Sequence, residues 1–473
     1  MINNSSNSIT VPRGLAARFL LRCRSNSTAT RSRTSADVVV KPSLANVLEK
    51  SGRFDSPYGR FLQSRRNDND PENIMIPRRK TKRVTIGGVP IGNQAPVAIQ
   101  SMTSTYTRDV DATVRQIRTL AEAGCDIVRV AVPEKSDTDA LPSILEQSPV
   151  PIIADVHFHF ERALESIEAG VHKIRLNPGN IQDRKQVDRV IAACRDRGIP
   201  IRVGVNEGGV VERRDKLRRV DQQDRLADDY RGEMIRLMVA LLEDYMRIFD
   251  ENDFHDVVLS AKCVDATMVI DAYRAVAERF DLPLHLGLTH AGPPETGRIR
   301  SIASLGSLLA MGIGDTIRIS YASDPIHEVE DAKELLCSLG MRNRVEPELI
   351  ACPTCGRIEI DLIKLVADVR IKLAGIKTPV KVAVMGCVVN GPGEAEGADV
   401  AVFAGKGKGI IYVQGEQTRT VDEADMLDAL YEETVAFADR VEKGEIQLTH
   451  GAVNIVPPDP LPRKDGSIPL PVR

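Results

Sequence analysis

Eight short runs rich in β-branched residues occupy the middle of this 473-residue chain, and each is followed by a stretch with the spacing of an amphipathic helix. The runs cover residues 97–102, 127–132, 151–156, 173–176, 201–206, 257–262, 284–289 and 316–320. Alternating strands and helices predict βα units around a parallel sheet. Eight units over about 260 residues match the size of a (β/α)8 TIM barrel. An open doubly wound sheet is the competing architecture, but no Gly-x-Gly-x-x-Gly sequence follows the first run.

The segments that flank the predicted barrel have different patterns. The run 84–91, interrupted by Gly87 and Gly88, predicts a hairpin that closes the barrel bottom. From about residue 346 the chain is typical of a smaller α+β domain, with helices at 360–373 and 422–441 and strands at 380–385, 400–403 and 410–413. We therefore predict an extension at 1–80, a substrate-binding TIM barrel at 81–345, an α+β cluster domain at 346–443 and a Pro-rich tail at 444–473.

Composition and charge exclude some function classes. The formal net charge of −3 argues against an electrostatic nucleic-acid footprint over the whole molecule. No run of about 18 apolar residues occurs, so neither a transmembrane helix nor a membrane partner is expected. Residues 1–36 contain six Arg and seven Ser but no Asp or Glu, which is typical of an organellar transit peptide. A bacterial extension, or a start codon assigned too early, fits the same composition.

Eight cysteines without a secretory signal indicate a reduced intracellular protein. Five of them suggest no chemical role: Cys23 lies in the extension, and Cys125, Cys194, Cys263 and Cys337 lie in apolar or strand-end stretches, where a buried cysteine behaves as a small hydrophobic residue. Cys352, Cys355 and Cys387 differ, because a Cys-x-x-Cys turn and a later loop supply three thiolates, enough for three corners of a [4Fe–4S] cube. Glu394 is the candidate fourth ligand. A structural zinc site is the alternative, although no nearby Cys or His completes its usual ligand set.

Polar and cationic residues recur at the carboxyl ends of the predicted barrel strands, where TIM barrels place their active sites. They are Arg129, Asp155, His157, Arg175, Asn177, Arg202, Asn206, Lys262, Arg318 and Ser320. Four arginines and a lysine on separate strands suit a ligand with several negative charges, since guanidinium forks match phosphate oxygens. A single arginine in such a place is more often a surface ion-pair partner, but recurrence on successive strands favours a binding role.

Several familiar catalytic motifs do not occur in the sequence. It contains no Gly-x4-Gly-Lys-Ser/Thr loop, no nucleophile elbow and no His-Glu-x-x-His zinc motif. Residues 405–409 (Gly-Lys-Gly-Lys-Gly) resemble a phosphate loop only in composition, and we interpret them as a hairpin turn. The sequence also contains no nucleotide or flavin fingerprint. If the three thiols hold an iron–sulfur cluster that carries out a reduction, its electrons must come from an external donor.

Seven stretches together resemble one known family closely. They are 99–103 (Ile-Gln-Ser-Met-Thr), 127–130 (Ile-Val-Arg-Val), 154–158 (Ala-Asp-Val-His-Phe), 174–180 (Ile-Arg-Leu-Asn-Pro-Gly-Asn), 312–318 (Gly-Ile-Gly-Asp-Thr-Ile-Arg), 351–355 (Ala-Cys-Pro-Thr-Cys) and 386–394 (Gly-Cys-Val-Val-Asn-Gly-Pro-Gly-Glu). The family is 4-hydroxy-3-methylbut-2-en-1-yl diphosphate synthase of the methylerythritol phosphate route to isoprenoids. The resemblance runs from about residue 80 to 440.

The resemblance implies reductive ring opening and dehydration of 2-C-methyl-D-erythritol 2,4-cyclodiphosphate, with electrons from ferredoxin or flavodoxin. It also implies a homodimer in which the cluster domain of one subunit caps the barrel of the other. By the same analogy the [4Fe–4S] ligands are Cys352, Cys355, Cys387 and Glu394, and Asn390 lies by the cluster near the substrate. The diphosphate ligands implied are Arg129, Arg175, Arg202, Asn206, Lys262, Arg318 and Ser320.

One departure from the family concerns its acid. The family usually has Thr-Glu-Ala-Gly after the seventh strand, where this chain has Thr289-His290-Ala291-Gly292. The candidate replacements are His290 itself, which can donate a proton, and Glu295 five residues later. The chain also lacks the large extra domain of plant-type members. That absence favours a bacterial two-domain enzyme in the cytoplasm, with a plastid as the alternative if the extension is a transit peptide.

Two other functions fit parts of the sequence. A phosphate-binding TIM barrel with a structural zinc module would explain the cations and the thiols without redox chemistry. A pterin-binding barrel of the dihydropteroate synthase type would explain the barrel but leaves the cysteine-bearing domain without a purpose.

Overall fold

The computed structural model describes residues 76–156, 159–176, 183–210, 230–389, 391–395 and 397–448. Most of the predicted extension (residues 1–75 of 1–80) and most of the predicted Pro-rich tail (residues 449–473 of 444–473) therefore lie outside the described residues. Among the described helices, none is long and apolar enough to cross a membrane.

The barrel is an eight-stranded parallel sheet in the order β8-β7-β6-β5-β4-β3-β10-β9. Its strands are β3 (Ala98–Met102), β4 (Ile127–Ala131), β5 (Ile152–Val156), β6 (Lys173–Leu176), β7 (Ile201–Asn206), β8 (Val257–Lys262), β9 (His285–Leu286) and β10 (Thr316–Ile317). A parallel bridge between Leu259 and Leu284 links β8 to the chain just before β9 and almost closes the ring. All eight predicted strands are present, so the TIM barrel is confirmed.

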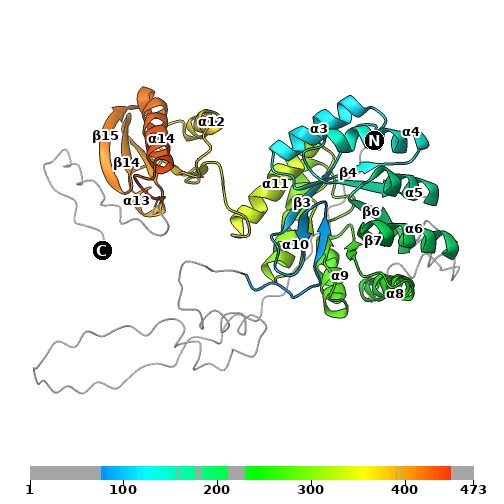
Figure 1. Cartoon of the computed structure of the whole chain (residues 1–473). Coiled ribbons are helices and arrows are strands. Elements are labelled where there is room, and N and C mark those ends of the chain that lie inside the picture. Colours follow the sequence, from blue (N-terminus) through cyan, green and yellow to red (C-terminus); the bar gives the residue numbers. More distant parts are fainter. Residues whose placement is uncertain are drawn as a thin grey trace, which may run out of the picture. The chain divides into compact units, whose positions relative to one another are not determined.

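Helices alternate with the strands and pack around them (Figure 1). They are α3 (Val110–Glu122), α4 (Lys135–Gln147), α5 (Phe160–Ala169), α6 (Arg184–Arg197), α8 (Tyr230–Glu251), α9 (Ala266–Arg279), α10 (Pro294–Ala310) and α11 (Pro325–Ser338). Asp109, Asp183 and Asp265 cap α3, α6 and α9 by accepting backbone N–H groups of the first turn, which satisfies donors that a helix start leaves without partners.

A hairpin closes the amino-terminal end of the barrel, as the sequence predicts. Its strands β1 (Val84–Ile86) and β2 (Val89–Ile91) pair antiparallel. Ile86 and Ile91 are fully buried and pack against Ala98, Ile127 and Ile153, which lie at or near the starts of β3, β4 and β5. Gly87 in the turn has φ +53°, and a Cβ atom there would lie 2.6 Å from the His172 ring, so only glycine fits.

The carboxyl-terminal domain has its own five-stranded sheet in the order β11-β12-β13-β14-β15. Its elements are β11 (Glu348–Ala351), α12 (Leu362–Leu373), β12 (Lys381–Met385), α13 (Gly391–Glu394), β13 (Val400–Gly405), β14 (Lys408–Val413), β15 (Glu416–Asp422), η3 (Glu423–Asp425) and α14 (Met426–Glu442). The first three strands are parallel and the last three antiparallel, and β13 and β14 pair as a hairpin across the predicted Gly/Lys turn. The predicted helix start at residue 422 was wrong, because β15 occupies residues 416–422.

The arm that precedes the hairpin is bound to the barrel. Arg78 forms an ion pair with Asp315 at 2.9 Å and donates to the Gly314 carbonyl at 2.9 Å. Arg79 donates to carbonyls at the end of α9 and beyond it, including Ala277 and Leu282. The side chain of Asp315 is 3% exposed, and its carboxylate also accepts the Leu284 N–H. Arg78 and Arg79 thus lie against the bottom of the barrel.

We expect Arg78→Ala to lower the free energy of unfolding of the barrel by about 3 kcal/mol, because it leaves a buried carboxylate without its nearest cation. Urea unfolding followed by circular dichroism measures the change. Arg83→Ala is the matched control, since Arg83 is an exposed residue of the same arm. Equal stability of the two variants would contradict a structural role for the Arg78–Asp315 pair.

Candidate active site

A cavity of about 250 Å³ lies inside the barrel toward the carboxyl ends of its strands. Nine predicted site residues line it: Arg129, Asp155, Arg175, Arg202, Asn206, Lys262, His290, Arg318 and Ser320. Glu295 does not line it; this residue is exposed in the first turn of α10. His157, Asn177 and Asn390 lie outside the described residues. The structure therefore brings together most of the predicted barrel site.

Parallel register brings these side chains together. Asp155 on β5 is the register partner of Arg175 on β6, which in turn is the partner of Arg202 on β7. Asn206 at the end of β7 is likewise the partner of Lys262 at the end of β8. Because aligned residues on neighbouring parallel strands point to the same face, a row of polar side chains faces the barrel interior.

Asp155 lies between two arginines of the cavity wall. One carboxylate oxygen is 3.5 Å from Nε of Arg129, and the other is 3.2 Å from Nη1 of Arg175. Arg129, Arg175, Arg202 and Lys262 are each less than a tenth exposed. Among the described residues that line the cavity, the cations therefore outnumber the one carboxylate. That carboxylate belongs to Asp155, predicted as a substrate ligand, which pairs with two of the cations.

Burial makes this concentration of positive charge costly. Desolvation lowers the pKa of Arg129 to about 10, and it also lowers the pKa of Arg202 and of Lys262 well below their ordinary values. Neighbouring cations lower each pKa further. Within the described residues, Nη1 of Arg202 and Nε of Arg318 are buried without a hydrogen-bond partner. A bound polyanion would supply the missing acceptors and offset the repulsion.

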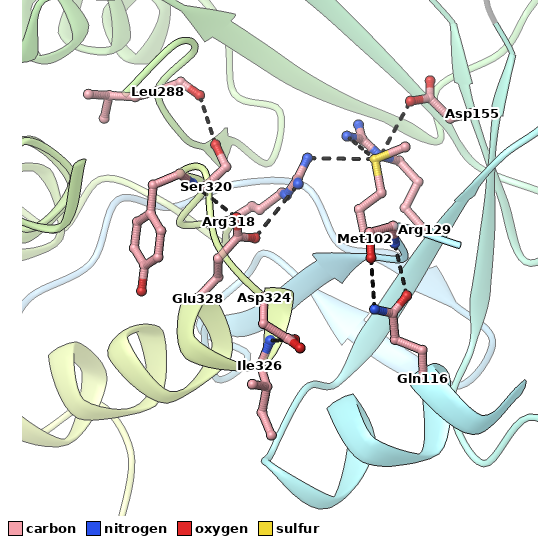
Figure 2. Close-up of polar contacts among 12 residues, drawn as sticks. Met102, Gln116, Arg129, Asp155, Leu288, Arg318, Ser320, Asp324, Ile326 and Glu328 are labelled. Atoms are coloured by element: carbon pink, nitrogen blue, oxygen red, sulfur yellow. Dashed lines mark hydrogen bonds and ion pairs between the residues drawn. The ribbon is translucent and has the colours of Figure 1, made fainter. Parts of the chain in front are cut away.

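Sequence reasoning missed four residues of this region. Ser260, Leu288 and Thr289 also line the cavity. Ser260 was predictable, since it lies two positions before Lys262 on β8 and shares its face. Met102 was not: its sulfur accepts from Nε and Nη2 of Arg129 at 3.2 and 3.0 Å and lies 3.7 Å from Nη1 of Arg318 (Figure 2). The thioether lies between the two guanidinium groups because β3 is the neighbour of both β4 and β10 in the sheet, which the sequence does not show.

The thiols of the second domain follow two adjacent parallel strands. Cys352 comes directly after β11, and Cys387 lies two residues after β12, its hydrogen-bonded neighbour. The sulfur of Cys352 accepts a hydrogen bond from the Gly386 N–H at 3.2 Å. Such an N–H donor stabilises a thiolate ligand. Cys355 is exposed, and Glu394 ends the short helix α13, its side chain lying outside the described set.

The second domain offers three thiols, Cys352, Cys355 and Cys387, as possible ligands of a metal centre. Among the described side chains, no group of three or more His, Cys, Asp or Glu is placed to hold one metal ion. An iron–sulfur cube spreads its thiolate ligands over separate iron atoms, so it needs them around a larger volume. The three thiols of the Cys352–Cys387 loops therefore fit a cluster in residue type and strand placement.

Glycines allow the loop after β12 to lie close to the sheet. A Cβ atom on Gly391 would lie 2.5 Å from the ring of Phe403, which is buried on β13. A Cβ atom on Gly386 would lie 3.2 Å from Ile358. This packing gives a physical reason for glycines on both sides of Cys387.

The fold and both sites define a TIM-barrel protein with a cationic barrel cavity and a second, thiol-bearing domain. Residues 81–333 match the family model of the GcpE TIM-barrel domain, and residues 348–436 match that of the GcpE protein C-terminal domain. The chain belongs to the 4-hydroxy-3-methylbut-2-en-1-yl diphosphate synthase family.

Relatives named 4-hydroxy-3-methylbut-2-en-1-yl diphosphate synthase (flavodoxin) match along nearly their whole length. The protein of Symbiobacterium thermophilum is 47% identical over 76% of this chain and 93% of its own. That of Geobacillus thermodenitrificans is 45% identical over 77% and 94%. A solved dihydropteroate synthase of Yersinia pestis is 15% identical, covers 55% of this chain and 97% of its own, and has a TM-score of 0.39. A likeness that low carries no argument about function.

We expect the rate of reaction with iodoacetamide to distinguish the buried cysteines of the barrel from the exposed cysteine of the second domain. Burial raises the pKa of the Cys125, Cys194 and Cys263 thiols to about 12. At about pH 8 roughly one part in ten thousand of each is ionised, so these barrel thiols should resist iodoacetamide in folded, metal-free protein. We expect exposed Cys355 to be labelled first, as peptide mapping by mass spectrometry can measure. Denatured protein, labelled at every cysteine, is the control, and early labelling of Cys194 would contradict the assignment.

Proposed function

We propose that this chain converts 2-C-methyl-D-erythritol 2,4-cyclodiphosphate into 4-hydroxy-3-methylbut-2-en-1-yl diphosphate, a step of the methylerythritol phosphate pathway. The product is the one given in the names of its relatives. Reductive ring opening breaks one C–O bond to the cyclic diphosphate and the C–O bond of a neighbouring hydroxyl, takes up two electrons and two protons, and releases the hydroxyl oxygen as water. The observation that carries the proposal is the barrel cavity, where four cations on four strands and Arg318 just after β10 surround a space suited to a small polyanion. Family membership does not favour the alternative of a phosphate-binding barrel with a zinc module.

The barrel residues divide by chemistry in this proposal. Arg129, Arg175, Arg202, Lys262 and Arg318 bind the two phosphates, and Asn206 and Ser320 donate further hydrogen bonds. Rigid guanidinium groups, held by Asp155 and Met102, keep their positions without the ligand, so little ordering accompanies binding. His157 and Asn177 remain proposed ligands from the sequence alone.

The second domain supplies the redox group in this proposal. Cys352, Cys355, Cys387 and Glu394 would hold a [4Fe–4S] cluster, and Asn390 would lie beside it. When bound, the cluster would supply single electrons, and one of its iron atoms would act as a Lewis acid toward an oxygen atom of the substrate. Flavodoxin, named in the relatives, is the proposed donor, with ferredoxin as the alternative. A homodimer in which each cluster domain caps the partner's barrel, and a cytoplasmic location, are further parts of the proposal.

Protein purified without oxygen should be brown, absorb at about 400 nm and turn over the cyclic diphosphate with reduced flavodoxin. We expect Cys387→Ala to lose both the absorbance and the turnover, because one cluster ligand is gone. Cys337→Ala, in the barrel helix α11, is the matched control and should keep both. Colourless protein with stoichiometric zinc, or turnover retained in Cys387→Ala, would refute the cluster role.

We assign the proton-donor role to His290 rather than Glu295, because His290 lines the cavity and Glu295 does not. His290→Gln should lower kcat about 100-fold, the usual effect of losing a general acid. Glu295→Gln, an exposed change five residues later, should leave kcat within about twofold. Steady-state kinetics with the cyclic diphosphate distinguishes them, and the reverse pattern would move the role to Glu295.

A further inference from the structure

Glu328 is a buried carboxylate behind the wall of the barrel cavity. It lies in the first turn of α11 and is 4% exposed. One carboxylate oxygen accepts the Tyr321 N–H at 3.0 Å, and the other is 3.7 Å from Nη2 of Arg318 (Figure 2). Glu328 itself does not line the cavity, whereas Arg318 does. Its carboxylate therefore accepts a hydrogen bond from the backbone of the segment that follows β10 and forms an ion pair, without a hydrogen bond, with the Arg318 guanidinium.

Arg318 has few other partners. Its Nη1 lies 3.7 Å from the sulfur of Met102, a weak acceptor, and its Nε has no hydrogen-bond partner among the described residues. Within the same set, Glu328 is the carboxylate paired with it. A long arginine side chain loses much rotamer freedom when it is fixed in one place, so its direction depends on such contacts.

The helix that carries Glu328 is firmly attached. Asp324 caps its start by accepting the Ile326 N–H at 3.0 Å, and Pro325 occupies its first turn. Val329 and Leu336 are buried in the barrel core. The Tyr321 hydroxyl donates to Asp331 on the same helix at 2.5 Å. Both the backbone and the ring of Tyr321 are thus bound to α11, which fixes the chain just after Arg318 and Ser320.

We infer that Glu328 is a positioning residue of the anion site, which holds the Arg318 guanidinium in the plane that a phosphate needs. This inference rests on the proposed function for the identity of the anion, and it adds a residue that orients one of the anion's ligands. Two effects of Glu328 oppose each other: its negative charge repels an incoming anion, whereas its contacts orient the cation that binds it. Orientation dominates, since a bidentate guanidinium–phosphate contact depends on direction, and a misdirected fork loses one of its two hydrogen bonds.

Binding of inorganic pyrophosphate to the full-length protein, measured by isothermal titration calorimetry, tests this inference. Glu328→Gln keeps the size and the acceptor for the Tyr321 N–H but removes the charge beside Arg318. We expect about tenfold weaker binding, equivalent to about 1.4 kcal/mol. Glu330→Gln, an exposed change two residues later on α11, is the matched control and should bind like the unchanged protein. Tighter or equal binding by Glu328→Gln would show that repulsion dominates and would overturn the inference.

A double-mutant cycle separates positioning from a general effect on the fold. If Glu328 acts through Arg318, then adding Glu328→Gln to Arg318→Lys should change pyrophosphate affinity less than twofold. A full tenfold further loss would mean independent action and would contradict the inference. In turnover assays, Glu328→Gln should raise KM about tenfold and leave kcat within about twofold, since ground state and transition state share the phosphate contacts.

These outcomes are distinguishable from failure of the proposed function. If the unchanged protein turns over the cyclic diphosphate while Glu328→Gln binds pyrophosphate normally, the inference fails and the proposed function stands. If Glu328→Gln weakens pyrophosphate binding but the protein shows no turnover with reduced flavodoxin, the proposed function fails and the positioning role stands.

Discussion

Repulsion among buried cations is the constraint on which the barrel site depends. Arg129, Arg175, Arg202 and Lys262 lie almost fully buried around one cavity, and Asp155 is the carboxylate that bridges two of them. An apolar interior would destabilise such a group unless polar neighbours or a ligand compensated it. The barrel supplies part of that compensation through Asp155, Glu328 and Met102, and it leaves the rest to an anion. The stability of the barrel and its proposed affinity for polyanions therefore depend on the same charges.

The parallel register of the strands determines where the charged side chains lie. Equivalent positions of β5, β6 and β7 point to one face, so a charged residue at each creates a row. Large aliphatic neighbours such as Val128, Val130 and Val203 alternate with the polar residues and pack outward against the helices. The cations thus stand on rigid strands rather than on loops, which keeps them in position before a ligand arrives.

Much of this arrangement could be predicted from the sequence, because it follows from local pattern. Periodicity located all eight barrel strands, and counting residues to the strand ends identified eight cavity residues. The ninth, His290, came from the comparison with the family motif. The features that were missed depend on contacts between distant segments. Met102 acts because β3 lies between β4 and β10, and Glu328 acts because the first turn of α11 packs behind Arg318. β15 was missed because its exposed residues, such as Gln417 and Thr418, lack the apolar alternation of a half-buried strand.

The choice between His290 and Glu295 shows why sequence distance is a poor guide at a strand end. Both residues follow β9 within ten positions. His290 has φ +54°, a left-handed backbone conformation that turns the chain right after the strand and leaves its side chain at the cavity. Gly292, with φ +100°, continues the turn, and Glu295 then enters α10 on its solvent side. Four residues thus separate a side chain that lines the cavity from one that does not, and the backbone path between them determines which is which.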